Sequence, residues 1–392
     1  MTVLVINSGS SSIKYQLVDP LSGESIASGL VERIGETTGH YEHSYAGKVT
    51  DIEEPVADHG AGLRKVIELF NTVGPSLADA HIKAIGHRVV QGGKYFNKAT
   101  VIDDAVADRI RQLIPLGPLH NPAHLKGIEV ARELFQGIPN VAVFDTAFFQ
   151  DLPAEAATYA LDRAVAEKYE IRRYGAHGTS HKFVSSRVSE LLGRHDLKQI
   201  VLHLGNGASA SAVVAGHAVD TSMGLTPLEG LVMGGRTGDI DPAAVFHLQR
   251  VAGMSVEEVD KLFNKLSGLK GLTGENDMRA VWAMADQGDV NAQEALDIYV
   301  HRIVHYVGAY TAEMGGLDVL TFTAGVGEND DRLRAKVLDR LAAFGVAYDA
   351  AINAERSKEP RTISTADSSV RVMVVPTNEE LAIAREAMEL IN

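Results

Sequence analysis

The feature that most constrains this chain is a strand–glycine turn–strand pattern that occurs twice. The apolar run Thr2–Ile6 leads into the serine-rich turn 7–12, and the alternating run Ile13–Val18 follows. The pattern returns about half a chain later, when the strand Ile200–Leu204 leads through Gly205–Ser209 into a second strand. Aligning Gly9 with Gly207 superimposes both copies, which predicts an internal duplication into two similar domains with a cleft between them.

The first turn has the composition of a phosphate-binding loop. Gly9 lets a ligand approach the backbone, the serines add hydroxyl groups, and Lys14 adds a positive charge. The alternatives are a flexible polar hairpin tip and a linker. A Walker A loop is excluded, because that motif opens a helix and the element after this turn is a strand.

Strands and helices alternate along the first part of the chain, which indicates an α/β fold. We expect a strand at 82–90, a helix that Asn121 caps and that runs to about Phe135, and a strand at 140–144. The N-terminal domain is placed at 1–148, with a C-terminal helix at 380–392, capped by Thr377, that packs back on it. The C-terminal domain is placed at 149–379, with a loop over 268–279.

Composition narrows the classes of partner. The chain has 392 residues, no cysteine and a formal net charge of −14, so it is long enough for two domains and carries no disulfide or thiolate site. The acidic balance argues against nucleic acid or an anionic membrane as a partner. No apolar run reaches the roughly 18 residues of a membrane span, and no signal peptide is visible. We expect a cytoplasmic protein.

A dinucleotide-binding site is disfavoured. The spacing of Gly205, Gly207 and Ala210 fits a relaxed form of the fingerprint, but that fingerprint must open a helix and a strand follows here. A third glycine turn, at Gly325 and Gly327, does open a helix, yet no partner carboxylate follows a second strand. An oxidoreductase is therefore disfavoured. A non-catalytic ATP-gated binding module would need a client-binding domain, for which no segment is left.

Two arginines stand in glycine-rich loops outside any amphipathic pattern. Arg88 and Arg236, together with His177 and Asp145, could form an anion-stabilising site of the kind that phosphoryl transfer needs. The alternative for each arginine is a solvated surface position. His203 lies inside a strand and fits a core histidine as well as a phosphate contact.

Eight blocks of the chain resemble the acetokinase family, the acetate kinases. They come in the order of that family and span the whole sequence: 7–14, 87–93, 144–148, 173–181, 203–207, 238–242, 322–329 and 377–380. The resemblance implies the duplicated actin, sugar-kinase and heat-shock-ATPase fold, which is ribonuclease H-like. It also implies reversible transfer of a phosphoryl group between ATP and acetate, giving ADP and acetyl phosphate, in a cytoplasmic homodimer with Mg²⁺ or Mn²⁺.

The resemblance also assigns roles to individual residues. Asn7 and Glu379, which are plausible oxygen ligands, would hold Mg²⁺. Arg88 would bind the substrate carboxylate, and His177 and Arg236 would stabilise the phosphoryl group in flight. The acyl pocket would be formed by Val90, Leu119 and Pro227. The C-terminal domain would bind the nucleotide, whose contacts would be Lys14, His203, Leu204, Gly205, Asn206, Gly207, Asp277, Met278, Arg279, Gly325, Val326, Gly327, Glu328 and Asn329.

Asp145 would be the acid/base residue by resemblance, but the chemistry argues otherwise. A small carboxylic acid titrates near pH 4, so acetate is already a nucleophile at neutral pH and needs no base. Asp145 would then orient an arginine or a water molecule on Mg²⁺. Two positions depart from the family pattern: Ala176 replaces a phenylalanine, which favours propionate as an alternative substrate, and Gly235 replaces a threonine beside Arg236.

Overall fold

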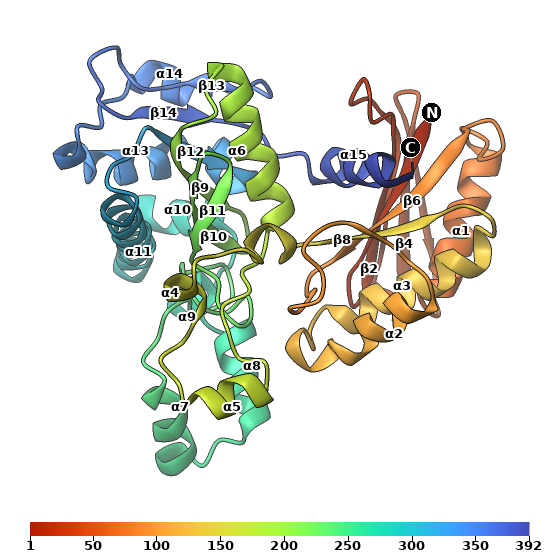
Figure 1. The fold of residues 1–392 in the computed structure, drawn as a ribbon, viewed down its shortest axis with the longest axis horizontal. Coiled ribbons are helices and arrows are strands. Elements are labelled where there is room, and N and C mark those ends of the chain that lie inside the picture. The colour runs from red at the N-terminus through yellow and green to blue at the C-terminus, as the bar shows by residue number, and fades with distance from the viewer. Residues whose placement is uncertain (392) are drawn as a thin grey trace. The chain divides into compact units, whose positions relative to one another are not determined.

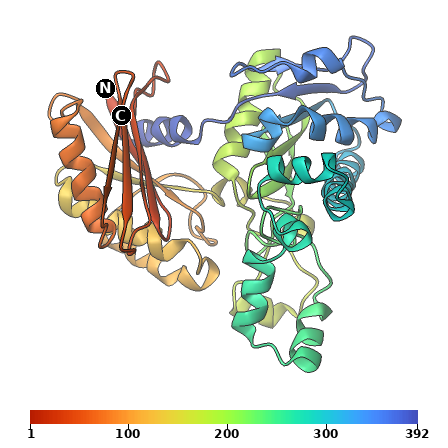
Figure 2. The same cartoon turned by 180° about the vertical axis from the view of Figure 1, so that it is seen from behind.

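The computed structural model describes residues 1–391 and divides the chain into two units. Unit 1 comprises residues 1–150 and the C-terminal segment from Asn378, and unit 2 comprises residues 151–377. Figures 1 and 2 show a sheet with helices on both faces in each unit. None of the helices within residues 1–391 is long and apolar enough to cross a membrane.

Unit 1 is built on an eight-stranded mixed sheet of order β5-β4-β3-β2-β1-β6-β8-β7. Leu4 and Ile6 of β1 face α1 and α3, and these side chains form one apolar cluster. The opposite face of the sheet carries α15, because Ile383 packs so closely over β6 that a Cβ on Gly86 would lie 2.6 Å from it. The elements are β1 Thr2–Ser8, β2 Ser12–Val18, β3 Ser25–Glu32, β4 Gly39–Tyr45, β5 Lys48–Glu54, α1 His59–Thr72, β6 Ile82–Val89, β7 Thr100–Val101, α2 Asp104–Gln112, η1 Ile114–Leu116, α3 Asn121–Leu134, β8 Asn140–Phe144, η2 Ala147–Phe149 and α15 Glu379–Ile391.

Unit 2 is built on a six-stranded sheet of order β11-β10-β9-β12-β14-β13. Ile200 and Leu202 of β9 face the long helix α11, whereas Val201 packs with Val184 and Val188 of α6 on the other face. The elements are α4 Ala154–Ala157, α5 Arg163–Lys168, α6 Gly178–Leu192, β9 Lys198–Leu204, β10 Ala208–Val214, β11 His217–Thr221, α7 Ala243–His247, η3 Leu248–Ala252, α8 Val256–Lys265, α9 Gly268–Thr273, α10 Met278–Asp286, α11 Val290–Glu313, β12 Val319–Thr323, α12 Ala324–Asn329, α13 Asp331–Asp339, η4 Ala342–Phe344, α14 Ala350–Ala354, β13 Arg361–Thr362 and β14 Arg371–Val374.

The duplication is visible in the pairing of the strands. In unit 1, β1 pairs with β2 antiparallel and with β6 parallel, and in unit 2 β9 pairs with β10 antiparallel and with β12 parallel. The registers correct our alignment of the two turns. The amide of Gly9 donates to Ser12 O at 2.7 Å, and the amide of Gly205 donates to Gly207 O at 3.0 Å. Gly9 therefore corresponds to Gly205, and our alignment was two residues out.

Three local predictions were wrong. Asn121 does not cap α3 from outside: it is the first residue of the helix, and its side chain bonds the backbone of Gln91 instead. Thr377 does not cap α15, because Asn378 Oδ1 accepts from the amide of Leu381 at 2.9 Å. The loop expected at 268–279 contains helix α9 and the start of α10.

Candidate functional site

The polar centre of unit 1 lies where two neighbouring parallel strands end. Arg88 is near the end of β6, and Asp145 follows directly after β8, so both side chains reach the same edge of the sheet. The guanidinium donates to the carboxylate from Nη2 at 2.7 Å and from Nε at 3.1 Å. Glu379 of α15 adds a second carboxylate, 3.7 Å from Nε of Arg88. Three residues from distant parts of the sequence thus form one charged cluster.

Burial and charge act against each other in this cluster. Burial disfavours a charged guanidinium, but the carboxylates of Asp145 and Glu379 outweigh it and raise the pKa of Arg88. Burial raises the pKa of the Asp145 carboxyl, and Arg88 offsets this only in part. Both carboxylate oxygens of Asp145 accept hydrogen bonds from Arg88. This is the geometry of a group that orients the arginine, not that of a general base.

The expected metal ligands, Asn7 and Glu379, also belong to unit 1. Asn7 is at the end of β1, and Glu379 opens α15, which packs against β1 and β6. An amide oxygen and a carboxylate are hard donors of the kind that Mg²⁺ takes, and Mg²⁺ is usually held by one or two carboxylates with water and substrate phosphates. Within residues 1–391 no group of three or more histidine, aspartate or glutamate side chains is arranged to hold a metal by itself. The chemistry of these two donors fits Mg²⁺ with water completing its coordination.

The other predicted residues of unit 1 differ in exposure. Lys14 forms an ion pair with Glu380 of α15, and its side chain is otherwise largely exposed. Val90 is buried, and its amide donates to Nδ1 of His124 at 3.2 Å, whereas Leu119 is 37 % exposed. Pro227, the third predicted member of the acyl pocket, belongs to unit 2.

In unit 2, three predicted side chains converge on the turn between β9 and β10. A Cβ built on Gly207 would lie 3.4 Å from Nε2 of His177 and 3.9 Å from Nη1 of Arg236. The ring of His203 stacks on that of His177, with the centroids 4.2 Å apart. A Cβ here would make ordinary contacts with both groups and cover the backbone, so the glycine leaves the turn open beside an imidazole and a guanidinium.

Arg236 is a positive group without a carboxylate close by. Its Nη1 donates to Pro227 O at 3.2 Å, and within residues 1–391 no acidic side chain lies within ion-pair distance. Burial lowers the pKa of Arg236 from its usual value. With a glycine at position 235, the Arg236 side chain still has fixed contacts, because its Nη1 bonds Pro227 O and lies 3.8 Å from Sδ of Met233. A half-buried cation of this kind favours binding of an anion.

Buried serine hydroxyl groups form hydrogen bonds on the Nδ1 side of His177. Its Nδ1 lies 2.9 Å from Oγ of Ser209, and the same oxygen lies 2.7 Å from Nε2 of His181. Nδ1 of His181 is in turn 2.7 Å from Oγ of Ser211. His203 has a similar support, with its Nδ1 2.8 Å from Oγ of Ser180. Burial lowers the pKa of His181 well below its usual value, so this ring is neutral.

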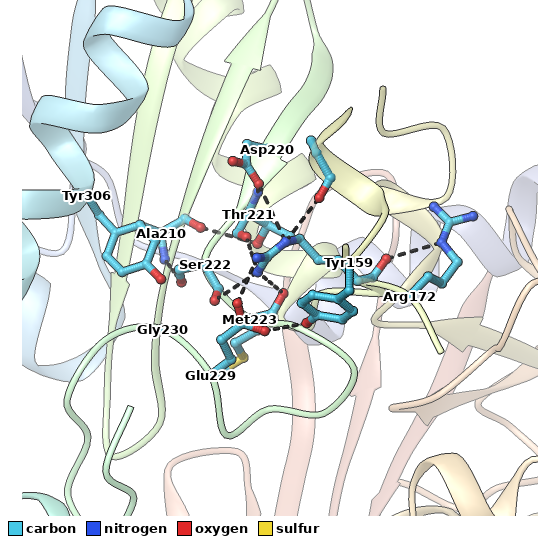
Figure 3. A network of polar contacts seen from close by, with 12 residues as sticks. Tyr159, Arg172, Ala210, Asp220, Thr221, Ser222, Met223, Glu229, Gly230 and Tyr306 are labelled. Atoms are coloured by element: carbon cyan, nitrogen blue, oxygen red, sulfur yellow. Dashed lines mark hydrogen bonds and ion pairs between the residues drawn. The ribbon is translucent and has the colours of Figure 1, made fainter. Parts of the chain in front are cut away.

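Arg173 follows Arg172 in the loop before His177 and donates to a carbonyl oxygen at the end of β11; Figure 3 shows the surrounding residues, among them Thr221, Glu229 and Tyr159. Its Nη1 donates to the carbonyl oxygen of Thr221 at 3.0 Å, and its Nη2 donates to Glu229 Oε1 at 2.7 Å. Tyr159 donates to the other oxygen of Glu229. The segment that ends in Arg236 begins at this point, so one side chain braces the segments that carry both His177 and Arg236.

A pocket of about 880 Å³ lies in unit 2 beside the same turn. Most of the predicted nucleotide contacts line it: Gly205, Asn206, Asp277, Met278, Arg279, Gly325, Val326 and Asn329. The volume is in the range of small-molecule sites. Arg279 grips both oxygens of Asp277, and this contact lowers the pKa of Asp277 to about 2.

The remaining predicted contacts of unit 2 do not line this pocket. His203, Gly207 and Leu204 lie in or after β9, and Leu204 is fully buried. Gly327 is buried in α12, which is a short helix and not the open turn that we expected. The side chain of Glu328 bonds the backbone and not an open site: its Oε1 accepts from the amides of Ala324 at 2.8 Å and Thr377 at 3.1 Å.

Sequence reasoning missed several residues of this site. Trp282 lines the pocket, donates to Asp330 at 2.7 Å and lies under the guanidinium of Arg332. A single tryptophan in an amphipathic helix is typical of a core residue, so no sequence pattern marked it as part of a binding site. Ala176, which the sequence did single out, is 2 % exposed and belongs to the core of unit 2.

The comparisons with known proteins agree along the whole chain. A sequence profile of the acetokinase family matches residues 2–385. An acetate kinase of Leifsonia xyli subsp. xyli is 55 % identical over 391 residues, which cover 99 % of this chain and 98 % of that protein.

Two solved structures are similar throughout. The acetate kinase of Porphyromonas gingivalis has a TM-score of 0.94 at 39 % identity and covers 100 % of both chains. A propionate kinase of Francisella tularensis has a TM-score of 0.93 at 41 % identity and covers 99 % of both chains. With the duplicated α/β fold, this agreement over the full length is decisive: the chain belongs to the acetokinase family.

Proposed function

We propose that this chain transfers the γ-phosphoryl group of ATP to the carboxylate of acetate, reversibly and in a single in-line step. A carboxylate oxygen attacks the γ-phosphorus, the bond to the β–γ bridging oxygen breaks, and ADP leaves with the electron pair of that bond. The products are acetyl phosphate and ADP. No proton has to be removed from the nucleophile, because acetate is ionised at neutral pH.

One observation carries this proposal. An imidazole and a guanidinium without a nearby carboxylate border the open backbone at Gly207, next to a pocket of nucleotide size. Phosphoryl transfer requires little from a protein beyond positioning and positive donors around the equatorial oxygens. His177 and Arg236 supply these donors, and the pocket residues hold the nucleotide.

Arg88 of unit 1 is the proposed ligand of the acceptor carboxylate. Its bond to Asp145 fixes the plane of the guanidinium while leaving Nη1 for the substrate. Asp145 therefore acts as an orienting group for Arg88. This assignment replaces the acid/base role that the family resemblance suggests.

Mg²⁺ is the proposed metal, with Asn7 and Glu379 as its protein ligands. Bound to the nucleotide phosphates, the ion would neutralise charge on the phosphoryl oxygens. Glu379 is suited to this role because its carboxylate is accessible on one side and held near Arg88 on the other. Mn²⁺ fits the same oxygen donors. The homodimer and the cytoplasmic location remain predictions of the family resemblance.

Propionate is the second candidate substrate, because Ala176 is smaller than the phenylalanine that the resemblance leads us to expect. The test is to trap acyl phosphate with hydroxylamine from ATP and Mg²⁺, with acetate, propionate and butyrate side by side. Dominant product from acetate supports the proposal, and dominant product from propionate moves the substrate within the family. No product from any acid, with folded protein that binds ATP, would refute the proposed chemistry.

An Ala176→Phe variant refines this test. If Ala176 enlarges the acyl site, the variant shifts the product ratio from propionate towards acetate. An unchanged ratio would show that position 176, buried in the core of unit 2, does not set the acyl preference.

A further inference from the structure

We infer that Ser209 is a positioning residue that fixes the tautomer of His177, so that Nε2 carries the hydrogen and Nδ1 accepts one. The inference rests on the proposed function for its catalytic meaning, because a phosphoryl oxygen needs a donor. The assignment of the tautomer itself rests on the geometry of the hydrogen bonds. Ser209 is fully buried in β10, and its only hydroxyl hydrogen faces two imidazole nitrogens.

With all bonds running in one direction, two arrangements of the chain Ser211–His181–Ser209–His177 are possible; a third, in which both imidazoles donate to Ser209, leaves the hydrogen of the buried Ser209 without an acceptor. A serine hydroxyl has one hydrogen, and a neutral imidazole has one N–H. In the first arrangement, Ser211 donates to Nδ1 of His181, Nε2–H of His181 donates to Ser209, and Ser209 donates to Nδ1 of His177. In the second arrangement every bond is reversed.

The two arrangements differ at the buried end. Ser211 is fully buried, and its hydroxyl has one hydrogen-bond partner within residues 1–391, which is Nδ1 of His181. In the second arrangement Nδ1 of His181 donates to Ser211, and the hydrogen of Ser211 has no acceptor. A buried donor without an acceptor costs the free energy of its lost hydration. The first arrangement gives every hydrogen between Ser211 and Nδ1 of His177 an acceptor and is therefore the stable one.

The consequence lies at the opposite end of the chain. In the first arrangement Nδ1 of His177 is an acceptor, so the proton of the neutral ring sits on Nε2. That nitrogen is the one that lies 3.4 Å from the Cβ position of Gly207, near Arg236. In the second arrangement Nε2 would present a lone pair to an anion. Ser211, two strand positions from Ser209, thus determines which edge of His177 can donate.

Neighbouring groups support a neutral ring. The ring of His203 stacks on His177 at 4.2 Å, and the guanidinium of Arg236 borders the same Gly207 position as Nε2 of His177; a positive charge on either group disfavours a second one on His177. His181 lies behind it and is neutral. The tautomer of His177 is therefore the property that matters, and Ser209 controls it.

The test reads the tautomer directly by ¹⁵N NMR of histidine-labelled protein at pH 8.5, with His177 assigned from a His177→Gln variant. We expect a protonated Nε2 and an unprotonated Nδ1 in the wild type, and a mixture of tautomers in Ser209→Ala. The rate of acyl phosphate formation by Ser209→Ala should fall about 10- to 100-fold at unchanged KM for ATP and acetate. Ser209→Thr, which keeps the hydroxyl, should restore both signals.

Ser189→Ala is the matched control, because this buried serine of α6 bonds Gln199 and no histidine. It should leave the tautomer and the turnover unchanged. A wild-type His177 protonated at Nδ1 overturns the inference, and so does an unchanged tautomer in Ser209→Ala. A shifted tautomer at full turnover overturns the positioning role. If the wild type forms no acyl phosphate, the proposed function fails, while the NMR result still decides the tautomer.

Discussion

The two units place different chemistry at equivalent positions of the same strand arrangement. The strand registers match Asn7 and Lys14 of unit 1 with His203 and Ser209 of unit 2. One step further along the sheet, the position of Arg88 corresponds to that of Thr323, which pairs with His203. Unit 1 therefore has an amide and two cationic groups where unit 2 has one imidazole and two hydroxyl groups.

This difference determines how each centre is held together. In unit 1, Arg88, Asp145 and Glu379 are positioned by attraction between full charges in a buried place. In unit 2, His177, Ser209 and His181 are positioned by neutral hydrogen bonds whose direction matters. A charge cluster tolerates small displacements but not loss of one partner, whereas a hydrogen-bond chain depends on every hydrogen having an acceptor.

The largest effect should come from removing one charge of unit 1. Asp145→Asn leaves Arg88 with one distant carboxylate, so we expect a loss of about 3 kcal/mol in the free energy of unfolding. Acyl phosphate formation should fall strongly because Arg88 loses its orientation. Urea unfolding and the hydroxylamine assay, run over a range of Mg²⁺ concentrations, measure both effects.

The double variant Arg88→Met/Asp145→Leu separates the two effects. Apolar side chains of similar volume should recover most of the stability without restoring activity.

Near-normal turnover of Asp145→Asn at saturating Mg²⁺ would remove both the orienting and the acid/base role. A recovery that appears only at high Mg²⁺ would assign Asp145 to the metal instead.

Acid should destabilise the protein through histidines that both units bury as neutral rings. Burial lowers the pKa of His87 to about 4, and it lowers the pKa values of His124 and His181 as well. Between pH 6.5 and about 4 the unfolded chain binds protons that the folded His87 does not, so stability falls as the pH falls. For His87 alone the loss is on the order of 3 kcal/mol.

The check is the free energy of unfolding as a function of pH, in the wild type and in His87→Gln. The variant is less stable at neutral pH, because it loses the 2.7 Å bond to Asn140, but its curve should be flatter in this window. Equal slopes would mean that His87 is already protonated in the folded protein or that other groups dominate.

Arg173 differs from the neutral groups that position His177 in unit 2, because it acts through a charged guanidinium. Arg173→Met removes the ion pair with Glu229 and the bonds to the carbonyl oxygens of Thr221 and Ser222. We expect a loss of about 2 kcal/mol in the free energy of unfolding and a lower kcat at a nearly unchanged KM for ATP. Glu229→Gln, which keeps one oxygen acceptor for Arg173 and replaces the other, the acceptor of the Tyr159 hydroxyl, with an amide donor, is the milder control.

A lower KM for ATP, or an unchanged kcat, in Arg173→Met would contradict the bracing role. Either result would show that the segments of His177 and Arg236 keep their places without this side chain. The residues around His177 would then be held by neutral bonds, and the contrast with unit 1 would become sharper.

The sequence was informative where chemistry follows strand order. Arg88 and Asp145 each stand at the end of an apolar strand before a glycine-rich or polar loop, and parallel neighbours bring such ends together. The duplicated fold was predictable for the same reason, since both copies start with a strand, a glycine turn and a strand.

Other features depend on register and could not be read from the chain. Ser209 and His181 meet across 28 residues because one helix face packs over one strand position, and no spacing rule encodes that contact. The same limit explains Gly9, which we matched with Gly207 although the ladder matches it with Gly205. Asn121 and Thr377 carry the sequence signature of a helix cap but bond other partners, because tertiary contacts outweigh the local preference.

Glu328 gives the smallest and most discriminating test of the comparison. Motif matching placed it with the nucleotide, but its Oε1 accepts from the amides of Ala324 and Thr377 inside unit 2. Glu328→Gln keeps an oxygen acceptor, so we expect a loss of about 1 kcal/mol and a change in the KM for ATP of less than about two-fold. Glu328→Ala should cost more stability, again with little effect on KM. A large rise in the KM for ATP in Glu328→Gln, at unchanged stability, would return this residue to the nucleotide site and show that unit 2, like unit 1, uses a full negative charge there.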